Sequence, residues 1–350
     1  MRREIEEVPA VVSRFLADGD AQVESAASAI RRASPTFAAI VARGTSDHAA
    51  IHLRYLLETE LGIPTGLAAP SVTTIYGADV RWAGGLVIAV SQSGRSPDLI
   101  AVVEAARLAG ATTVAIANDA VSPLAAAVEY VIDCRAGEEF AVAATKSYVA
   151  QLAAGAALVA ALADDGRLAG ALSWMPAVLE ASLAAAATAI HDESPIVAEF
   201  AASERSIVIS RGYDYPTALE TALKLKETGR LFAEGYSSAD FSHGPVVLSG
   251  AGVPVLAIRP DGVMGPAVDE GVAAARATGG QPWVVAGADA GQVAVTDDRL
   301  IRLPLPRDLP DGLAPLATIL PGQILAEAVA RRRGYDPDAP PGLRKVTLTR

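Results

Sequence analysis

The sequence has few of the features that mark secreted, membrane or metal-binding proteins. One cysteine, Cys134, occurs among 350 residues, which excludes an internal disulfide and argues against a cysteine-based metal cluster. The opening MRREIEE carries acids where a signal peptide needs an apolar stretch. The most apolar helical run, 150–163, contains Gln151 and is shorter than the ~20 residues that span a bilayer. These absences predict a cytoplasmic protein with no membrane partner.

Positive charge is also scarce, because the formal net charge is −11. An acidic surface repels nucleic-acid phosphates and anionic lipids, so neither is an expected partner. A small anionic molecule is not excluded, since the donors of a local site can outweigh the net charge. Hydrophobic residues make up 51% and charged residues 20%, which is typical of a globular chain, and the length suggests two modest domains or one large one.

Three common motifs are missing from the sequence. It contains neither GxxxxGK[ST] nor a GxGxxG that follows a strand, and its serine loop lacks the GxSxG pattern of serine hydrolases. The sequence therefore predicts no nucleotide cofactor, and we expect no metal.

An internal repeat predicts the fold. AIVARGTSD (39–47) resembles IVISRGYDY (207–215), and LVIAVSQSG (86–94) resembles PVLAIRPDG (254–262) at the same spacing along the chain. Strands separated by helices form parallel sheets with right-handed crossovers. The repeat predicts an α/β protein of two similar domains, each a flavodoxin-like or Rossmann-like three-layer parallel sheet flanked by helices. The predicted parts are an N-terminal helical region (1–29), domain one (30–165), a linking helix (166–194), domain two (195–335) and a tail (336–350).

The stretch LVIAVSQSGRSPDLI (86–100) predicts a buried strand, a polar turn and a helix start. Residues 86–90 are apolar, 91–95 form the turn, and Ser96-Pro97-Asp98 has the pattern of an N-cap, a first-position proline and a first-turn acid. Backbone N–H groups, hydroxyls and the Arg95 guanidinium meet there, as a phosphate requires. The alternative is an ordinary capped loop. Because the loop after the first strand, with Thr45 and Ser46, should face the same crevice, we favour a phosphate site.

A second candidate stretch is YPTALETALKLKETGRLFAEGYSSADFSHGP (215–245). In its predicted helix Glu220, Lys224 and Glu227 share one face. They could be exposed ion pairs of little consequence. Glu227, however, lies in the last turn, where the helix dipole disfavours a carboxylate, and such a group is suited to proton transfer.

A short helical turn is predicted after Ser237, closed by Gly244-Pro245. His243 lies at the closing point, between polar residues and the Gly-Pro pair. The other histidines, His48, His52 and His191, fall within helical patterns. His243 is therefore the histidine that we expect to take part in chemistry.

Six motifs together resemble the sugar isomerase (SIS) domain family. They are RGTSD, SQSGRSPDL, EEFAVAATKSY, ALETALKLKE, SSADFSHGP and LRKVT, in the family's order and over almost the whole chain. The resemblance is to the paired SIS domains that form the isomerase half of glutamine:fructose-6-phosphate aminotransferases. It implies two tandem SIS domains.

The resemblance also implies roles for individual residues. The sugar phosphate would be held by Thr45, Ser46, Ser91, Gln92, Ser93 and Ser96. Glu227 would be the acid/base that moves a proton between C1 and C2, with Lys224 as its helper. His243 would open the sugar ring and would come from the neighbouring subunit of a homodimer. Lys345 would lie at the open-chain carbonyl, and Glu139 would be an acid that contacts the sugar.

Departures from the aminotransferase pattern guide the expected reaction. The chain opens at MRREIEE without a glutaminase cysteine, Asp240 replaces the usual glutamate, and SQSGRSPDL resembles the loop of stand-alone type II glucosamine-6-phosphate deaminases. We therefore expect an enzyme that converts glucosamine 6-phosphate and water to fructose 6-phosphate and ammonia. The alternatives are a deglycase for phosphorylated fructosamines and a non-catalytic sugar-phosphate sensor.

The tail, 336–350, carries the last prediction. Its prolines and lack of apolar periodicity resemble a disordered end. Leu343, Val346 and Leu348 are nevertheless apolar, so we expect them to anchor the tail and to place Lys345 at the substrate.

Overall fold

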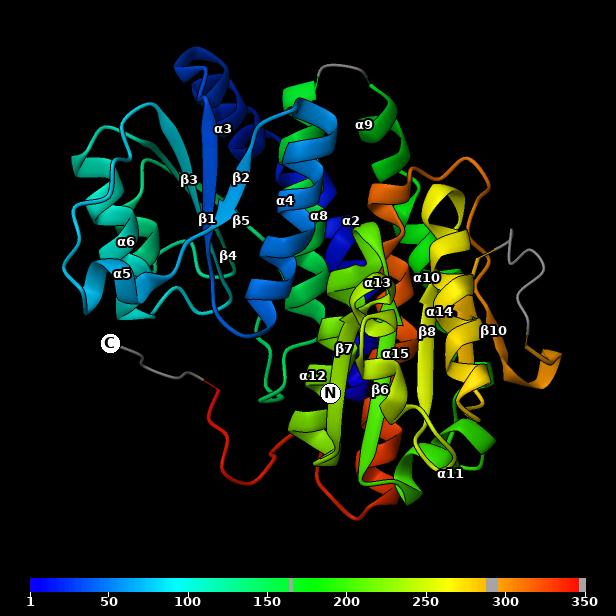
Figure 1. Ribbon diagram of the computed structural model, residues 1–350. Coiled ribbons are helices and arrows are strands. Elements are labelled where there is room, and N and C mark those ends of the chain that lie inside the picture. The colour runs from blue at the N-terminus through cyan, green and yellow to red at the C-terminus, as the bar shows by residue number, and fades with distance from the viewer. Residues whose placement is uncertain (164–165, 288–294, 346–350) are drawn as a thin grey trace. The chain divides into compact units, whose positions relative to one another are not determined.

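The computed structural model describes residues 1–163, 166–287 and 295–345, and its contacts divide the chain into two units (Figure 1). The N-terminal unit comprises, among the described residues, those of Ala10–Glu139 and Lys146–Trp174 together with Arg344 and Lys345. The C-terminal unit comprises Met1–Pro9, Phe140–Thr145 and Met175–Leu343.

The N-terminal unit is built on a five-stranded sheet in the order β2-β1-β3-β4-β5, with every neighbouring pair parallel. The strands are β1 (Phe37–Val41), β2 (Thr65–Leu67), β3 (Gly85–Ser91), β4 (Thr112–Ala117) and β5 (Tyr130–Asp133). Val41 pairs with Ala89 in the register of β1 and β3. Successive strands are added on one side of β1 as far as β2 and on its other side from β3 onward, so the loops that follow β1 and β3 leave at the switch point of the sheet, where ligands bind in this class of fold.

Helices cover both faces of this sheet because its central strands are apolar on both sides. β3 is buried throughout, and Val87, Val102, Val103 and Ala115 belong to the core between β3, β4 and α6. Figure 1 shows α5 and α6 on one side and α3, α4 and α8 on the other. Their bounds, with the remaining helices of this part, are α2 (Val8–Asp18), α3 (Asp20–Ala33), α4 (Thr45–Leu61), α5 (Pro70–Thr74), α6 (Pro97–Leu108), α7 (Pro123–Ala127), α8 (Lys146–Ala163) and α9 (Arg167–Leu172).

The C-terminal unit repeats this topology. Its parallel sheet has the order β10-β9-β8-β6-β7. Read from β7, the second strand of this unit lies at the edge and is followed by the first, third, fourth and fifth strands, as in the first sheet. The strands are β6 (Arg205–Ser210), β7 (Phe232–Ser237), β8 (Val255–Arg259), β9 (Trp283–Ala286) and β10 (Leu300–Arg302). The predicted fold class of two parallel sheets flanked by helices is thereby confirmed.

Two layers of helices enclose the second sheet as well. Ile209, Val268, Val272 and Val284 lie in the core beneath α14. The α-helices are α1 (Arg2–Glu6), α10 (Met175–Ala189), α11 (Pro195–Ala202), α12 (Tyr215–Gly229), α13 (Ser238–Ser242), α14 (Gly265–Ala277) and α15 (Pro315–Arg332). Short 3-10 turns are η1 (Gly212–Asp214), η2 (Pro245–Leu248), η3 (Gly262–Met264), η4 (Asp297–Arg299) and η5 (Asp311–Leu313).

Helix α12 is held closely between β7 and α15. A Cβ atom at Gly322 of α15 would lie 2.1 Å from the Thr221 hydroxyl oxygen of α12, and one at Gly235 of β7 would lie 2.8 Å from the Leu219 Cα. Only glycine allows both close approaches. These contacts fix the distances from α12, the helix that carries Lys224 and Glu227, to β7 and α15.

Two details differ from the expectations. The linking helix predicted at 166–194 is two helices, α9 and α10, which are separated at Ser173-Trp174. The stretches Lys146–Ala163 and Asp311–Arg332 are long and apolar enough to cross a bilayer, and the second was not singled out from the sequence. In the most apolar 18-residue window of each stretch, 78% of the first and 100% of the second is buried inside the protein, as in core helices.

Candidate functional site

The predicted phosphate-binding residues lie on the two loops at the switch point of the N-terminal unit. Thr45 begins α4, Ser91 ends β3, and Ser96 is the N-cap residue of α6 with Pro97 at its first position. The loop therefore ends at a helix N-terminus, as predicted. Its backbone N–H groups and hydroxyls lie at the carboxyl end of β3, where the strand order of the sheet reverses.

The serine hydroxyls of the second loop shape the turn. Ser91 Oγ accepts a hydrogen bond from Gly94 N at 3.0 Å, and Ser93 Oγ accepts one from Arg95 N at 3.3 Å. Ser96 makes no side-chain capping bond within the described part of α6. Each hydroxyl that accepts from the backbone keeps its own proton to donate, so the turn is ordered while its hydroxyls can still donate to an anion.

Gly94 sets the path of this turn. Its φ is +62°, and a Cβ atom there would lie 2.1 Å from the Ser122 hydroxyl. The left-handed conformation and the close approach both require glycine. Arg95, predicted to lie beside the phosphate, is exposed, and its guanidinium lies 3.7 Å from the Asp119 carboxylate.

Ser46 in the first loop has a partner that the sequence analysis did not identify. Gln151 of α8 donates from Nε2 to Ser46 Oγ at 3.0 Å, and both side chains are buried. Since the Ser46 hydroxyl oxygen accepts this bond, the hydroxyl proton can be donated to another acceptor. No local sequence signal connects Gln151 to Ser46, because the two residues lie on different helices.

Glu139 and Lys345 meet in the same unit. Lys345 Nζ donates to Glu139 Oε2 at 3.1 Å, and the same carboxylate accepts from Ser147 N at 3.2 Å and from Ser147 Oγ at 2.7 Å. The Glu139 side chain is fully buried, whereas Lys345 is 25% exposed. Leu343 is 44% exposed, so its predicted anchoring role is wrong, and Val346 and Leu348 lie outside the described residues.

In the C-terminal unit, Lys224 lies between two carboxylates of its own helix. Its ammonium pairs with Glu220 at 3.3 Å and with Glu227, and both Lys224 and Glu220 are fully buried. Burial by itself lowers the pKa of Lys224, but the charges of Glu220 and Glu227 outweigh burial and raise that pKa. The cluster is thus buried rather than a set of exposed pairs, and Glu227 alone keeps 24% exposure.

His243 caps the end of α13, whose N-cap residue is Ser237, as the sequence predicted. Gly244 follows with φ +147°, and Pro245 begins η2. His243 is exposed, and Val247 and Leu248 close by in the chain are exposed apolar residues.

Two further titratable groups are buried. Burial is the main reason that the pKa of Asp214 is raised to about 7, and the nearby charges of Asp311 and Asp261 raise it further. Burial also raises the pKa of the Cys134 thiol, so the single cysteine is a poor nucleophile. Among the described residues no group of histidine, cysteine, aspartate and glutamate could hold a metal ion.

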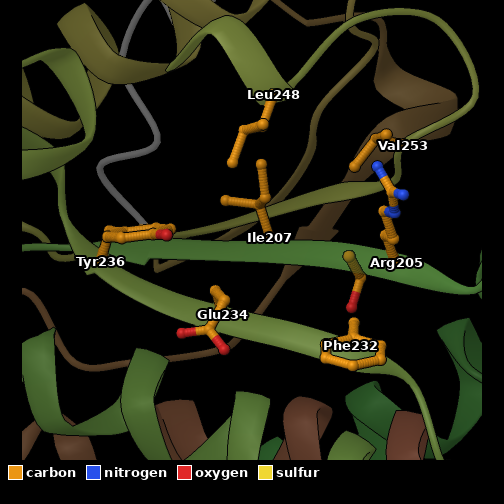
Figure 2. Close-up of a pocket in the computed structure, with 8 residues that line it drawn as sticks. Arg205, Ile207, Phe232, Glu234, Tyr236, Leu248 and Val253 are labelled. Atoms are coloured by element: carbon orange, nitrogen blue, oxygen red, sulfur yellow. The ribbon is translucent and has the colours of Figure 1, made fainter. Parts of the chain in front are cut away.

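A cavity of about 340 Å³ is lined by residues of β6 and β7 and by Leu248 and Val253 (Figure 2). Figure 2 shows Ile207 pointing toward Leu248, with the β7 side chains along one wall. The residues that define it include Arg205, Ile207, Phe232, Glu234, Tyr236 and Leu248. These differ from the predicted site residues.

Comparisons with known proteins agree with this fold. The SIS domain model matches residues 37–161 and 199–330. A glutamine–fructose-6-phosphate aminotransferase (isomerizing) of Gloeobacter violaceus is 36% identical over 99% of this chain, which spans 58% of that relative.

Two solved structures are also similar. A candidate phosphosugar isomerase of Silicibacter pomeroyi DSS-3 is 38% identical with a TM-score of 0.86, covering 97% of this chain and 99% of that one. The C-terminal domain of the Francisella tularensis glucosamine-fructose-6-phosphate aminotransferase is 26% identical with a TM-score of 0.86, covering 97% and 98%. The family model covers most of both sheets and the helices around them, and the chain therefore belongs to the SIS domain family.

Proposed function

We propose that this protein is a sugar-phosphate isomerase of amino-sugar metabolism that converts glucosamine 6-phosphate and water to fructose 6-phosphate and ammonia. The observation that carries the proposal is the pair of Lys224 and Glu227. Glu227 is a partly exposed carboxylate held by a buried ammonium, and this ammonium stays charged because Glu220 lies on its other side. Such a carboxylate can take a proton from carbon without losing its orientation.

The reaction follows from these groups. His243 opens the sugar ring, which gives an aldehyde at C1 and an amine at C2. Glu227 removes the proton from C2 and returns it to C1, and ammonium groups stabilise the oxyanion that forms in between. The oxygen on C1 takes up a proton and the nitrogen on C2 gives one up, so the product of this transfer is an imine at C2 beside a hydroxymethyl group at C1. Water adds to the imine, and ammonia leaves as the ketone of fructose 6-phosphate forms.

The N-terminal unit supplies substrate binding in this scheme. Hydroxyls of Ser91, Ser93 and Ser96, with Thr45 and Ser46, hold the phosphate at the switch point. Lys345, oriented by Glu139, donates to the oxygen of the open-chain carbonyl.

The relatives support the class of substrate. The Gloeobacter relative is named for fructose 6-phosphate and described as isomerizing. The direction of the reaction is supported by the loop SQSGRSPDL, which resembles that of type II deaminases. We also assign the enzyme to the cytoplasm.

We further propose that the protein acts as a homodimer in which His243 serves the partner subunit. His243 is exposed, and the segment that follows it exposes Val247 and Leu248. Exposed apolar residues beside a reactive histidine are typical of a shared interface. Mixing Glu227→Gln protein with His243→Asn protein should restore activity, because a hybrid dimer holds one complete set. No recovery in mixed dimers would place both residues in the same chain.

An ammonia-release assay tests the reaction directly. Purified protein is given hexosamine 6-phosphates and, separately, fructosamine 6-phosphates with different amines, and ammonia, free amine and ketose are measured. We expect ammonia and fructose 6-phosphate from glucosamine 6-phosphate. Release of free amine from the fructosamine adducts alone would identify a deglycase, and binding without turnover would identify a sensor.

A further inference from the structure

Arg43 and Asp98 connect the two loops of the proposed phosphate site. Arg43 lies between β1 and α4, two residues before Thr45, and Asp98 is the second residue of α6. The guanidinium reaches Asp98 Oδ2 through Nε at 2.9 Å and through Nη2 at 2.9 Å. One ion pair therefore joins the loop after β1 to the helix start after β3.

Asp98 presents an electrostatic difficulty for the site. Its side chain is only 1% exposed, and it lies in the first turn of the helix whose N-terminus would receive the phosphate. A sugar phosphate carries about −1.5 to −2 charges at neutral pH. A buried carboxylate without compensation would repel that anion, because water screens buried charges poorly.

The position of Arg43 removes this difficulty. Its guanidinium cancels the charge of Asp98, while 49% of its side chain is exposed at the end of the sheet. The pair also spans from the first loop to the second. The effect on the charge acts through Asp98.

We propose that Arg43 is the positioning residue of the phosphate site, which it makes selective for phosphorylated sugars by neutralising Asp98. The proposal rests on the function proposed above. It concerns binding rather than the proton transfer, and it can be measured by binding alone.

The test is calorimetric titration of inorganic phosphate, glucosamine 6-phosphate and unphosphorylated glucosamine into a set of variants. Arg43→Met should lower the affinity for inorganic phosphate and for glucosamine 6-phosphate by about 10- to 100-fold, the range expected for losing a charge-assisted contact. The affinity for glucosamine should be unchanged. Asp98→Asn should bind phosphate at least as well as the wild type. The double variant should regain most of the affinity, since the repelling charge is gone.

Two further variants separate this role from a general loss of structure. Arg43→Lys keeps the charge and should keep most of the affinity. Arg54→Met is the matched control, because Arg54 is 46% exposed and pairs with Glu58 at 3.1 Å within the same unit. It should bind phosphate as the wild type does. Thermal unfolding of each variant shows whether it is folded.

The outcomes distinguish the two proposals. Wild-type affinity in Arg43→Met, or a double variant as weak as Arg43→Met, would overturn the role of Arg43. Wild-type protein that binds phosphate but releases no ammonia would refute the deaminase reaction alone. Wild-type protein that binds neither phosphate ligand would refute both.

Discussion

The ammonium of Lys345 donates to the carboxylate of Glu139 at 3.1 Å, although 206 positions separate the two residues in the sequence. Ser147 gives the same carboxylate two more hydrogen bonds. A buried carboxylate that accepts three hydrogen bonds has a fixed orientation, and it therefore fixes the position of the Lys345 ammonium as well. Glu139 therefore acts on Lys345, in addition to any contact with sugar.

Replacing Lys345 with alanine should abolish most ammonia release without unfolding the protein. The side chain is 25% exposed, so little packing is lost. Loss of the group that stabilises the carbonyl oxygen should lower kcat by about 10²- to 10³-fold. Arg344→Ala, at the exposed neighbouring position, is the control. An unchanged rate in Lys345→Ala would show that the tail has no catalytic role.

Glu227→Gln should bind glucosamine 6-phosphate normally and lose turnover by about 10²- to 10⁴-fold, because the shape is kept and the base is lost. Solvent deuterium exchange at C1 and C2 of the bound sugar gives the direct measurement. Glu234→Gln removes a more exposed carboxylate that pairs with Lys226 and should exchange at the wild-type rate. Exchange at that rate in Glu227→Gln would assign the proton transfer to another residue.

Ser93→Ala and Ser96→Ala should each raise KM for phosphorylated sugars, with a smaller effect on kcat. One charge-assisted hydrogen bond contributes about 1.5–3 kcal/mol to binding. Ser96 makes no capping bond within the described part of α6, so its variant should unfold at the wild-type temperature. Ser122→Ala is the converse control, because Ser122 caps α7 by accepting from Ala125 N at 3.3 Å. It should lose stability and keep KM. Unchanged KM in both loop variants would place the phosphate elsewhere.

The sequence predicts the strands, the serine turn and the helix at 215–229 because each depends on local pattern. Periodicity places Glu220, Lys224 and Glu227 on one face, but it does not show that this face is turned inward. That burial comes from α15, whose Gly322 approaches Thr221 of α12. The pairing of Lys345 with Glu139 likewise depends on where the tail folds back. Neither relationship leaves a trace in local sequence.

Gly322→Ala should destabilise the C-terminal unit. The new methyl group would lie 2.1 Å from the Thr221 hydroxyl oxygen, so α12 and α15 must separate. Such overpacking typically costs about 1–3 kcal/mol. Gly170→Ala is the matched control, since a Cβ atom there meets nothing within 4 Å in helix α9. Alanine favours helix, so this control should be neutral or stabilising. Equal unfolding temperatures for the two variants would contradict the close contact.

Asp214 should make the protein less stable as the pH rises. Its carboxyl group is fully buried, and Thr217 and Thr318 donate to Oδ1. Burial raises its pKa from 3.8 to about 7, with smaller raising effects from Asp311 and Asp261. Between these two values the folded state holds a proton that the unfolded state has released. This group therefore favours folding most below about pH 4, and its contribution falls until about pH 7.

Asp214→Asn removes the titrating group and keeps an oxygen for the two threonine hydroxyls. The variant should lose less stability than the wild type between pH 5 and pH 8, and at pH 8 it should be the more stable protein by on the order of a few kcal/mol. Asp192→Asn is the control of opposite sign, because a hydrogen bond from Arg331 lowers the pKa of Asp192. That variant should be less stable than the wild type at both pH values. Urea unfolding at pH 5 and pH 8 measures all three proteins, and parallel pH dependence of the wild type and Asp214→Asn would show that Asp214 does not titrate on unfolding in this range.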